Sequence, residues 1–224
     1  MTAALLFDLD GTLVDSDAAH LRAFQRVFAA HGVAVDKQSY FKRIHGSDNS
    51  AIGRAFLPHL SEIEQAATLA AKEARYREDL GAIEAIAGID ALLDFAAARD
   101  LRCAVVTNAP RANVEAVLRA LGLAARLPLW VIGVELARAK PDPLPYRTAL
   151  ARLDAEAGRS VAFEDSLSGL SAAKGAGLTV VGLTTTLAAD KLLAAGAEIA
   201  VADFVDPRIL PLIEARSAAS GKKA

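Results

Sequence analysis

The feature that most constrains the fold is a regular alternation of short apolar runs with helical patterns from residue 89 onward. Strands that alternate with helices form βαβ units, and the strands of such units lie parallel in one sheet. The sequence therefore predicts an α/β protein. The expected strands are 102–107, 129–134, 161–163, 179–183 and 199–201, and the expected helices are 89–99, 112–121, 145–153, 167–176 and 191–195.

One more apolar run, Ala3–Leu9, precedes a long segment that shows helical periodicity alone. In this segment Leu21, Phe24 and Phe28 recur at helical spacing. The first strand must belong to the same sheet as the later ones, so the helical segment is inserted between them. We expect a core of residues 1–14 and 86–224 and an inserted helical domain of residues 15–85, with helices at 17–31, 38–44, 49–57 and 61–80.

Composition excludes several classes of function. Hydrophobic residues make up 53% of the 224 residues and the net charge is −2, which is typical of a globular protein and predicts no nucleic-acid partner. The single cysteine, Cys103, rules out an intrachain disulfide and a cysteine-based zinc site. No run is long enough to span a membrane, and the start is not typical of a signal peptide. We expect a cytoplasmic monomer or weak homodimer with a frayed tail at Ser217–Ala224.

Polar side chains follow four of the predicted strands. In an open parallel sheet, ligands bind at the carboxyl ends of the strands, so these side chains are expected to meet at one edge. They are Asp8 and Asp10 after the first strand, Thr107 and Asn108 after the second, Lys140 in the loop after the third, and Glu164 and Asp165 after the fourth.

This set of side chains suits metal-assisted phosphoryl transfer. Several carboxylates repel one another in a small site, and a divalent cation relieves the repulsion. Hard oxygen ligands favour Mg²⁺. The metal, the Lys140 ammonium and a hydroxyl would together bind a phosphoryl group. One carboxylate can attack phosphorus and form an aspartyl phosphate, while a second manages protons on the leaving oxygen and on water.

Four motifs carry a family resemblance. They are residues 8–16 (DLDGTLVDS), 105–109 (VVTNA), 140–143 (KPDP) and 163–166 (FEDS) with Gly169. Together they resemble the motifs of the haloacid dehalogenase-like hydrolase superfamily, in the same order and over nearly the whole chain. The resemblance implies a Rossmann-like parallel sheet core with an inserted all-helical cap domain that closes over the substrate.

The resemblance also implies a role for each core residue. Asp8 would be the nucleophile and Asp10 the general acid and base. Thr107 would hold the phosphoryl group, and Lys140 would balance its charge. The side chains of Asp8, Glu164 and Asp165, with the backbone carbonyl of Asp10, would surround Mg²⁺.

The motif Glu164-Asp165-Ser166 and the spacing from Asp15 to His20 are similar to the β-phosphoglucomutase and sugar-phosphate phosphatase branch. The mutases usually carry an arginine that grips a second phosphate. Here the matching stretch is 46–49 (GSDN), with Asn49 in that place, which favours hydrolysis.

We therefore expect a Mg²⁺-dependent phosphatase of a small phosphorylated metabolite such as a sugar phosphate. The alternatives are a β-phosphoglucomutase-like mutase, a phosphoglycolate phosphatase and a non-catalytic binding module. The candidate substrate-binding residues are Asn108, His20, Arg111 and Asn49. His20 could instead be an ordinary histidine on a helix surface. Arg111 could instead make no contact with the substrate.

Overall fold

The computed structural model describes residues 2–45, 47 and 49–218. Two residues of the 46–49 stretch, Gly46 and Asp48, lie outside the described residues, as does the part of the predicted tail at 219–224. The chain divides into two compact units, one of Met1–Asp15 with Glu84–Ala224 and one of Ser16–Ile83. We call them the sheet unit and the helical unit.

The sheet unit is built on six parallel strands in the order β3-β2-β1-β4-β5-β6. This order confirms the predicted Rossmann-like α/β sheet. The chain runs outward from β1 in one direction and then crosses to β4 on its other side, so the strand order reverses between β1 and β4. The strands are β1 (Ala4–Phe7), β2 (Arg102–Thr107), β3 (Trp130–Ile132), β4 (Val161–Glu164), β5 (Thr179–Leu183) and β6 (Ile199–Val201).

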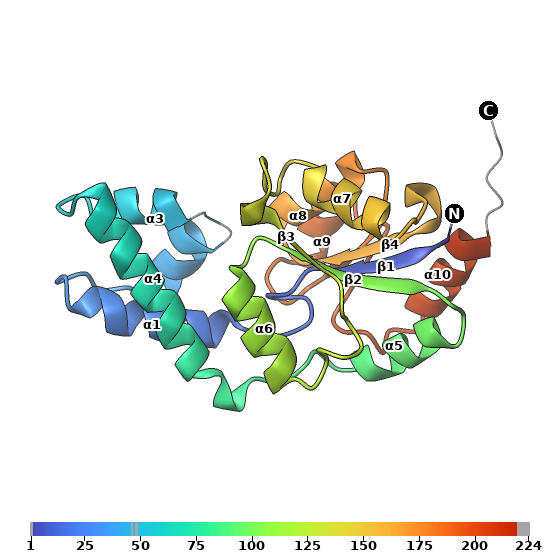
Figure 1. Cartoon of the computed structure of the whole chain (residues 1–224), viewed down its shortest axis with the longest axis horizontal. Helices are drawn as coiled ribbons and strands as arrows, with labels where there is room; N and C mark the ends of the chain where they lie inside the picture. The colour runs from blue at the N-terminus through green and yellow to red at the C-terminus, as the bar shows by residue number, and fades with distance from the viewer. Residues whose placement is uncertain (1, 46, 48, 219–224) are drawn as a thin grey trace. The chain divides into compact units, whose positions relative to one another are not determined.

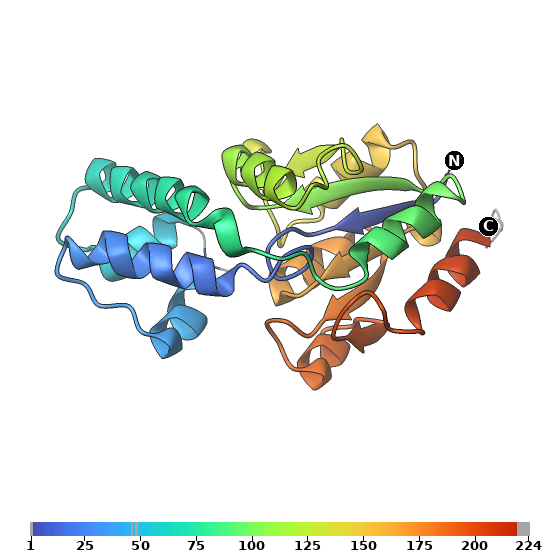
Figure 2. The same cartoon turned by 90° about the horizontal axis from the view of Figure 1, so that it is seen from below.

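Helices cover both faces of the sheet, which explains why the strands are mostly apolar and buried (Figure 1). On one face Leu6, Val106 and Ala162 belong to a buried cluster with residues of α7 and α8. On the other face the rings of Phe7 and Phe163 stack with centroids 4.9 Å apart. Figures 1 and 2 place α5 and α10 on the face opposite α7 and α8. The helices are α5 (Ile89–Ala97), α6 (Arg111–Ala120), α7 (Leu144–Arg152), α8 (Leu167–Gly175), α9 (Ala189–Ala194) and α10 (Ile209–Ala218), with short 3-10 helices at η3 (Gly133–Glu135) and η4 (Ala157–Arg159).

Two differences from the sequence expectations have clear causes. The strand predicted at 129–134 is only three residues long, because the chain turns into η3 at Gly133. Helix α10 was not predicted, and Ser217, assigned to the frayed tail, lies in it. Ile209 and Ile213, one helical turn apart, are both buried, and the Arg159 side chain donates to the Ser217 carbonyl at 3.1 Å. These contacts anchor α10 to the sheet unit.

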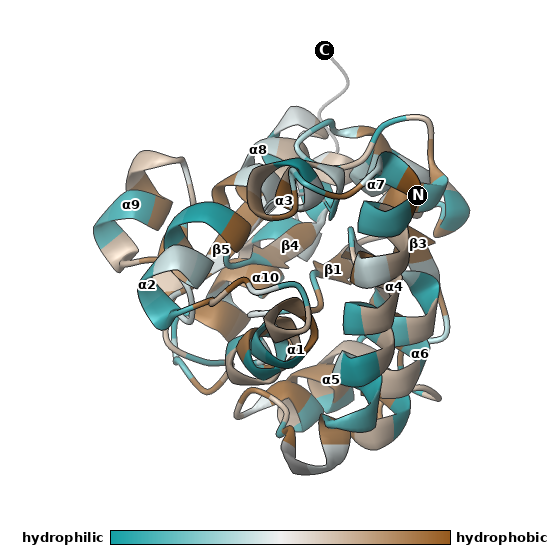
Figure 3. Cartoon of the chain, turned by 90° about the vertical axis from the view of Figure 1, so that its left-hand side faces the viewer, coloured by the Kyte–Doolittle hydropathy of each residue, from teal (hydrophilic) through white to brown (hydrophobic). Residues whose placement is uncertain are grey.

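The helical unit contains α1 (Asp17–Ala29), α2 (Lys37–Ser39), the π-helical η1 (Tyr40–Ile44), α3 (Asn49–Phe56), α4 (Glu62–Glu78) and η2 (Leu80–Ala82). Its core gathers apolar residues from α1, α3 and α4, among them Phe24, Phe56 and Leu69. Helix α4 begins with a capping box between Ser61 and Glu64. Figure 3 shows α4 banded in hydrophilic and hydrophobic colours, as expected for an amphipathic helix. None of the helices described in either unit is long and apolar enough to cross a membrane.

Candidate active site

The turn after β1 places a carboxylate next to the strand-order reversal. Asp8 follows the last residue of β1. The chain then turns at Gly11, which has a φ of +75° and donates its N–H to the Val14 carbonyl at 2.7 Å. A Cβ on Gly11 would lie 2.1 Å from Oδ2 of Asp165. Glycine is therefore needed here both for the backbone conformation and for the space that Asp165 occupies.

Three buried carboxylates meet beside this turn. Asp8, Glu164 and Asp165 each offer an oxygen, and these oxygens lie within 4.8 Å of one another. Asp8 directly follows β1, Glu164 is the last residue of β4 and Asp165 follows it, so the pairing of these two strands brings the three together. The buried Lys140 ammonium donates to Oδ1 of Asp8 at 2.7 Å and to Oε1 of Glu164 at 2.5 Å. One positive charge therefore faces three carboxyl groups.

The polar amide of Asn108 holds the Lys140 loop. Its Nδ2 donates to the Lys140 carbonyl at 3.0 Å, and its Oδ1 accepts from the Lys140 N–H at 3.1 Å. A Cβ on Gly133 would lie 2.2 Å from Oδ1 of Asn108, so this glycine leaves room for the amide. Asn108 was predicted to bind substrate. The structure engages both ends of its amide with backbone, and its visible contribution is to position Lys140.

Burial and repulsion shift the pKa values of the cluster. Burial raises the pKa of Asp8 to about 7, although the Lys140 ammonium opposes the shift. Burial, with repulsion from Asp8 and Glu164, raises the pKa of Asp165 well above its usual value. Burial alone would lower the pKa of Lys140, but the charges of Asp8 and Glu164 outweigh it and raise this pKa. The pKa values of Asp8 and Asp165 are raised although Lys140 acts to lower them, so its single charge does not neutralise the three carboxyl groups.

These residues fit a divalent cation. The three groups are carboxylates, which are the oxygen ligands that Mg²⁺ prefers. They are close enough for their oxygens to share one ion, and mutual repulsion adds to burial in raising the pKa values of Asp8 and Asp165. A cation at this place would favour the ionised forms that burial disfavours.

The sequence analysis missed two hydroxyl donors. Tyr146 of α7 is fully buried, and its hydroxyl donates to Oε1 of Glu164 at 2.6 Å. Burial and the neighbouring carboxylates raise the pKa of this phenol, so it stays a donor. Thr186, after β5, donates to Oδ2 of Asp165 at 2.5 Å. Tyr146 lies six positions after Lys140, but spacing alone does not distinguish it from an ordinary core aromatic residue of α7.

Asp10 and Thr107 lie in the same unit but outside the three-carboxylate group. Asp10 forms a β-bridge with Val14, and its charge contributes to the raised pKa of Asp8. Thr107 ends β2 and is buried, and its Oγ1 accepts from the Ala109 N–H at 3.0 Å. That bond leaves the hydroxyl hydrogen of Thr107 for another acceptor.

The other predicted binding residues are distributed over both units. Arg111, at the start of α6, forms a two-point ion pair with Glu135 at 2.9 and 2.6 Å. His20 and Asn49 belong to the helical unit. Nδ1 of His20 lies 2.8 Å from the Lys72 ammonium, and Nδ2 of Asn49 donates to Glu73 at 3.5 Å.

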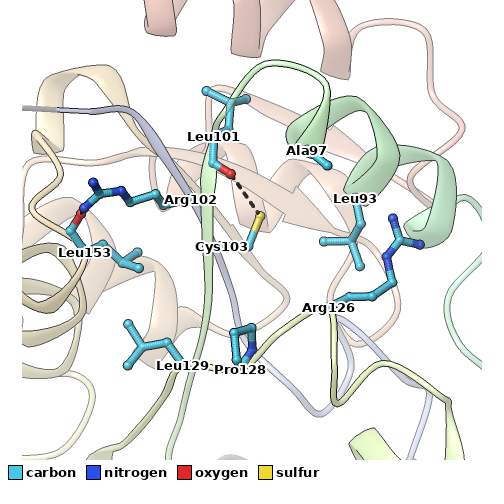
Figure 4. Close-up of a pocket in the computed structure, with 9 residues that line it drawn as sticks. All are labelled: Leu93, Ala97, Leu101, Arg102, Cys103, Arg126, Pro128, Leu129 and Leu153. Carbon is cyan, nitrogen blue, oxygen red and sulfur yellow. Dashed lines mark hydrogen bonds between the residues drawn. The ribbon is translucent and has the colours of Figure 1, made fainter.

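A separate cavity of about 430 Å³ lies where β2 begins, at the end of the strand away from Thr107 (Figure 4). Apolar residues line most of it, together with Arg102, Arg126 and Cys103. Burial raises the pKa of the Cys103 thiol to about 12, so this cysteine is a poor nucleophile at neutral pH. The cavity shares no residue with the carboxylate cluster.

Comparison with known proteins identifies the family. Residues 5–183 match the model of the haloacid dehalogenase-like hydrolases, and the chain belongs to this family. It is 34% identical to validoxylamine A 7'-phosphate phosphatase of Streptomyces hygroscopicus subsp. limoneus, over 93% of this chain and 97% of that protein. It is 39% identical to the protein CbbY of Cereibacter sphaeroides, over 81% and 84% of the two chains.

A solved structure agrees with this assignment. A variant of CbbY from Rhodobacter sphaeroides, crystallised in complex with xylulose-(1,5)bisphosphate, aligns with a TM-score of 0.80. The two sequences are 34% identical, and the alignment covers 92% of this chain and 96% of that one.

Proposed function

We propose that this chain is a Mg²⁺-dependent phosphatase that hydrolyses a small phosphomonoester through an aspartyl phosphate on Asp8. At the coarser level, it is a phosphoric monoester hydrolase of small phosphorylated metabolites, as its family and relatives indicate. The observation that carries the finer proposal is the buried cluster of Asp8, Glu164 and Asp165 around the Lys140 ammonium.

The first step is nucleophilic attack. A carboxylate oxygen of Asp8 forms a bond to phosphorus, and the bond from phosphorus to the ester oxygen breaks. Asp10 gives its proton to that oxygen, and the alcohol leaves. The Thr107 hydroxyl donates to a phosphoryl oxygen, which its bond from the Ala109 N–H permits because the Thr107 oxygen acts there as acceptor. The Lys140 ammonium balances developing negative charge.

The second step reverses the proton transfer. Asp10 accepts a proton from water, and the water oxygen attacks phosphorus. The bond to Asp8 breaks, and inorganic phosphate leaves. The side chains of Asp8, Glu164 and Asp165 and the Asp10 carbonyl would hold Mg²⁺, which when bound would neutralise phosphoryl charge and orient the group for in-line attack.

For the substrate we propose a sugar phosphate or similar metabolite, selected by the helical unit acting as a cap. The relatives support this class: one is named validoxylamine A 7'-phosphate phosphatase, and another was crystallised with xylulose-(1,5)bisphosphate. His20, Asn49 and Arg111 are the proposed contacts. Asn49 stands where the mutases usually carry an arginine, which supports hydrolysis over the mutase reaction.

The test is phosphate release from a panel of phosphorylated metabolites, with Mg²⁺ and with a chelator, for wild type and Asp8→Asn. We expect release that depends on Mg²⁺ and is lost in the variant. Release that survives Asp8→Asn in a clean preparation would contradict the mechanism. Conversion of a sugar 1-phosphate to the 6-phosphate without free phosphate would favour the mutase instead.

Two properties are proposals from composition alone. A cytoplasmic location is expected from the single cysteine, which suits a reducing compartment. A monomer or weak homodimer is the expected oligomeric state, and sedimentation velocity over a range of protein concentrations tests it.

A further inference from the structure

The buried phenol of Tyr146 contacts one carboxylate of the cluster and the ammonium group that the cluster surrounds. Tyr146 has no exposed surface, and its hydroxyl donates to Oε1 of Glu164 at 2.6 Å. The Lys140 ammonium also lies 5.1 Å from the centroid of the Tyr146 ring. Tyr146 therefore contacts Glu164 through its hydroxyl and Lys140 through its ring.

The two donors on Oε1 fix the orientation of Glu164. An ionised carboxylate oxygen has two lone-pair directions. On Oε1 of Glu164 one is taken by Tyr146 at 2.6 Å and the other by Lys140 at 2.5 Å. The second oxygen, Oε2, accepts a longer bond of 3.4 Å from Ser166. The carboxylate is thus held at Oε1, while Oε2 has the weaker contact.

The neighbouring backbone leaves little free space around the Glu164 carboxylate. A Cβ on Gly169 would lie 1.8 Å from Oε2 and 2.0 Å from Oε1 of Glu164. The carboxylate therefore fills the place that any other residue at 169 would need. A phenylalanine at 146 would fill the volume of the tyrosine ring without burying a hydroxyl. The hydroxyl contributes a directed bond rather than packing.

We propose that Tyr146 is a positioning residue for the metal site, whose hydroxyl, together with Lys140, holds Oε1 of Glu164 and so presents Oε2 to the cation. The proposal rests on the proposed function, because that function supplies the metal. Partners of metal ligands commonly change metal affinity when they are removed, since they set the ligand's orientation.

The test is Tyr146→Phe, which removes one oxygen atom and keeps the ring over Lys140. We expect Mg²⁺ binding measured by calorimetry to weaken by about tenfold. The Mg²⁺ concentration for half-maximal phosphate release should rise by the same factor. The kcat at saturating Mg²⁺ should change by less than about threefold, because the reacting groups are untouched.

The matched control is Tyr40→Phe in the helical unit. Tyr40 is also buried, and its hydroxyl also donates to a carboxylate, Asp17, at 2.9 Å. This control should lose a similar bond without any change in Mg²⁺ affinity. Thermal melts of both variants in chelator would report any loss of stability separately from metal binding.

The proposal is overturned if Tyr146→Phe binds Mg²⁺ as tightly as wild type, or if Tyr40→Phe weakens binding equally. It is also overturned if the wild type binds no Mg²⁺ in the calorimeter. Failure of the proposed function is a different result. In that case the wild type binds Mg²⁺ but releases no phosphate from any substrate, and the two variants still decide the role of Tyr146 by calorimetry.

Discussion

Within the part of the chain that the structure describes, buried charged side chains cluster in the sheet unit and in the helical unit, and the two clusters differ in their balance of charge. In the sheet unit, Lys140 contacts Asp8 and Glu164, and Asp165 adds a third carboxylate. In the helical unit, the buried Lys72 ammonium lies 3.1 Å from Oε1 of Glu73. The first cluster comes from three separate segments of the chain, whereas the second pairs two neighbouring residues of one helix, α4.

The surroundings of the two ammonium groups also differ. Lys72 lies 2.8 Å from Nδ1 of His20 and 4.3 Å from the centroid of the Phe24 ring. His20 in turn stacks on Tyr76 with ring centroids 3.8 Å apart. Aromatic faces stabilise an ammonium group. Excess carboxylates create a place for a cation, whereas the Lys72 ammonium already lies beside a carboxylate, an imidazole and an aromatic ring of the protein.

The largest expected effect comes from removing each ammonium. Lys140→Met should lower kcat/KM by a factor on the order of 10³, because the site loses a preorganised positive charge. Lys72→Met should lower the free energy of unfolding by about 3 kcal/mol, because it leaves the Glu73 carboxylate buried without its ammonium partner. Steady-state kinetics and urea unfolding measure the two effects. Near-normal turnover in Lys140→Met would show that Lys140, like Lys72, is not needed for catalysis.

A smaller effect is expected from filling the space around Glu164. In Gly169→Ala the new Cβ would overlap the Glu164 carboxylate, so we expect Mg²⁺ affinity to fall by roughly 10²-fold. The control is Gly158→Ala, because a Cβ there meets nothing within 4 Å. Calorimetric titration of both variants with Mg²⁺ is the measurement. Equal affinities in the two variants would show that Glu164 does not hold the metal.

Because the two clusters differ in charge balance, removing one carboxylate from each should change the metal-free stability in opposite directions. Asp8→Asn removes one of the crowded carboxylates, so in chelator at about pH 8 it should raise the free energy of unfolding by about 2 kcal/mol. Glu73→Gln removes the carboxylate that accompanies Lys72, so it should lower the same quantity by about 2 kcal/mol. Urea unfolding of both variants beside wild type gives the signs. The same sign in both would remove the distinction between the clusters.

Much of the fold followed from the sequence because its pattern is local. The six strands and their place in one parallel sheet follow from apolar runs that alternate with helices, and the structure confirms them. Helix α10 was missed because its stability comes from contacts with distant residues such as Arg159. For the site, strand ends indicated Asp8, Lys140, Glu164 and Asp165, which the structure brings together. Their catalytic roles remain predictions.

The partners of those residues could not be predicted from the sequence. Tyr146 and Thr186 look like an ordinary core aromatic and an ordinary loop threonine until the fold places their hydroxyls on Glu164 and Asp165. For Asn108 the fold adds a contact that the sequence did not indicate. Its substrate binding stays a prediction, and the structure shows that both ends of its amide bond the backbone of Lys140.

The smallest expected effect is a dependence of metal-free stability on pH. Burial raises the pKa of Asp8 to about 7, above the unfolded value of 3.8. Between these values the folded protein holds a proton that the unfolded chain has released, so the free energy of unfolding falls as the pH rises through this window. Mg²⁺ binding requires the ionised carboxylate and therefore strengthens over the same window. In chelator, the Tm should therefore fall as the pH rises from about 5 to 8, because folded Asp8 loses in this range the proton that its burial favours. Saturating Mg²⁺ should reduce this fall, and Asp8→Asn should lack the part that Asp8 contributes. A metal-free Tm that rises across this range in wild type and variant alike would show that the fold does not raise the pKa of Asp8. The two clusters would then not differ in the way their charges affect stability.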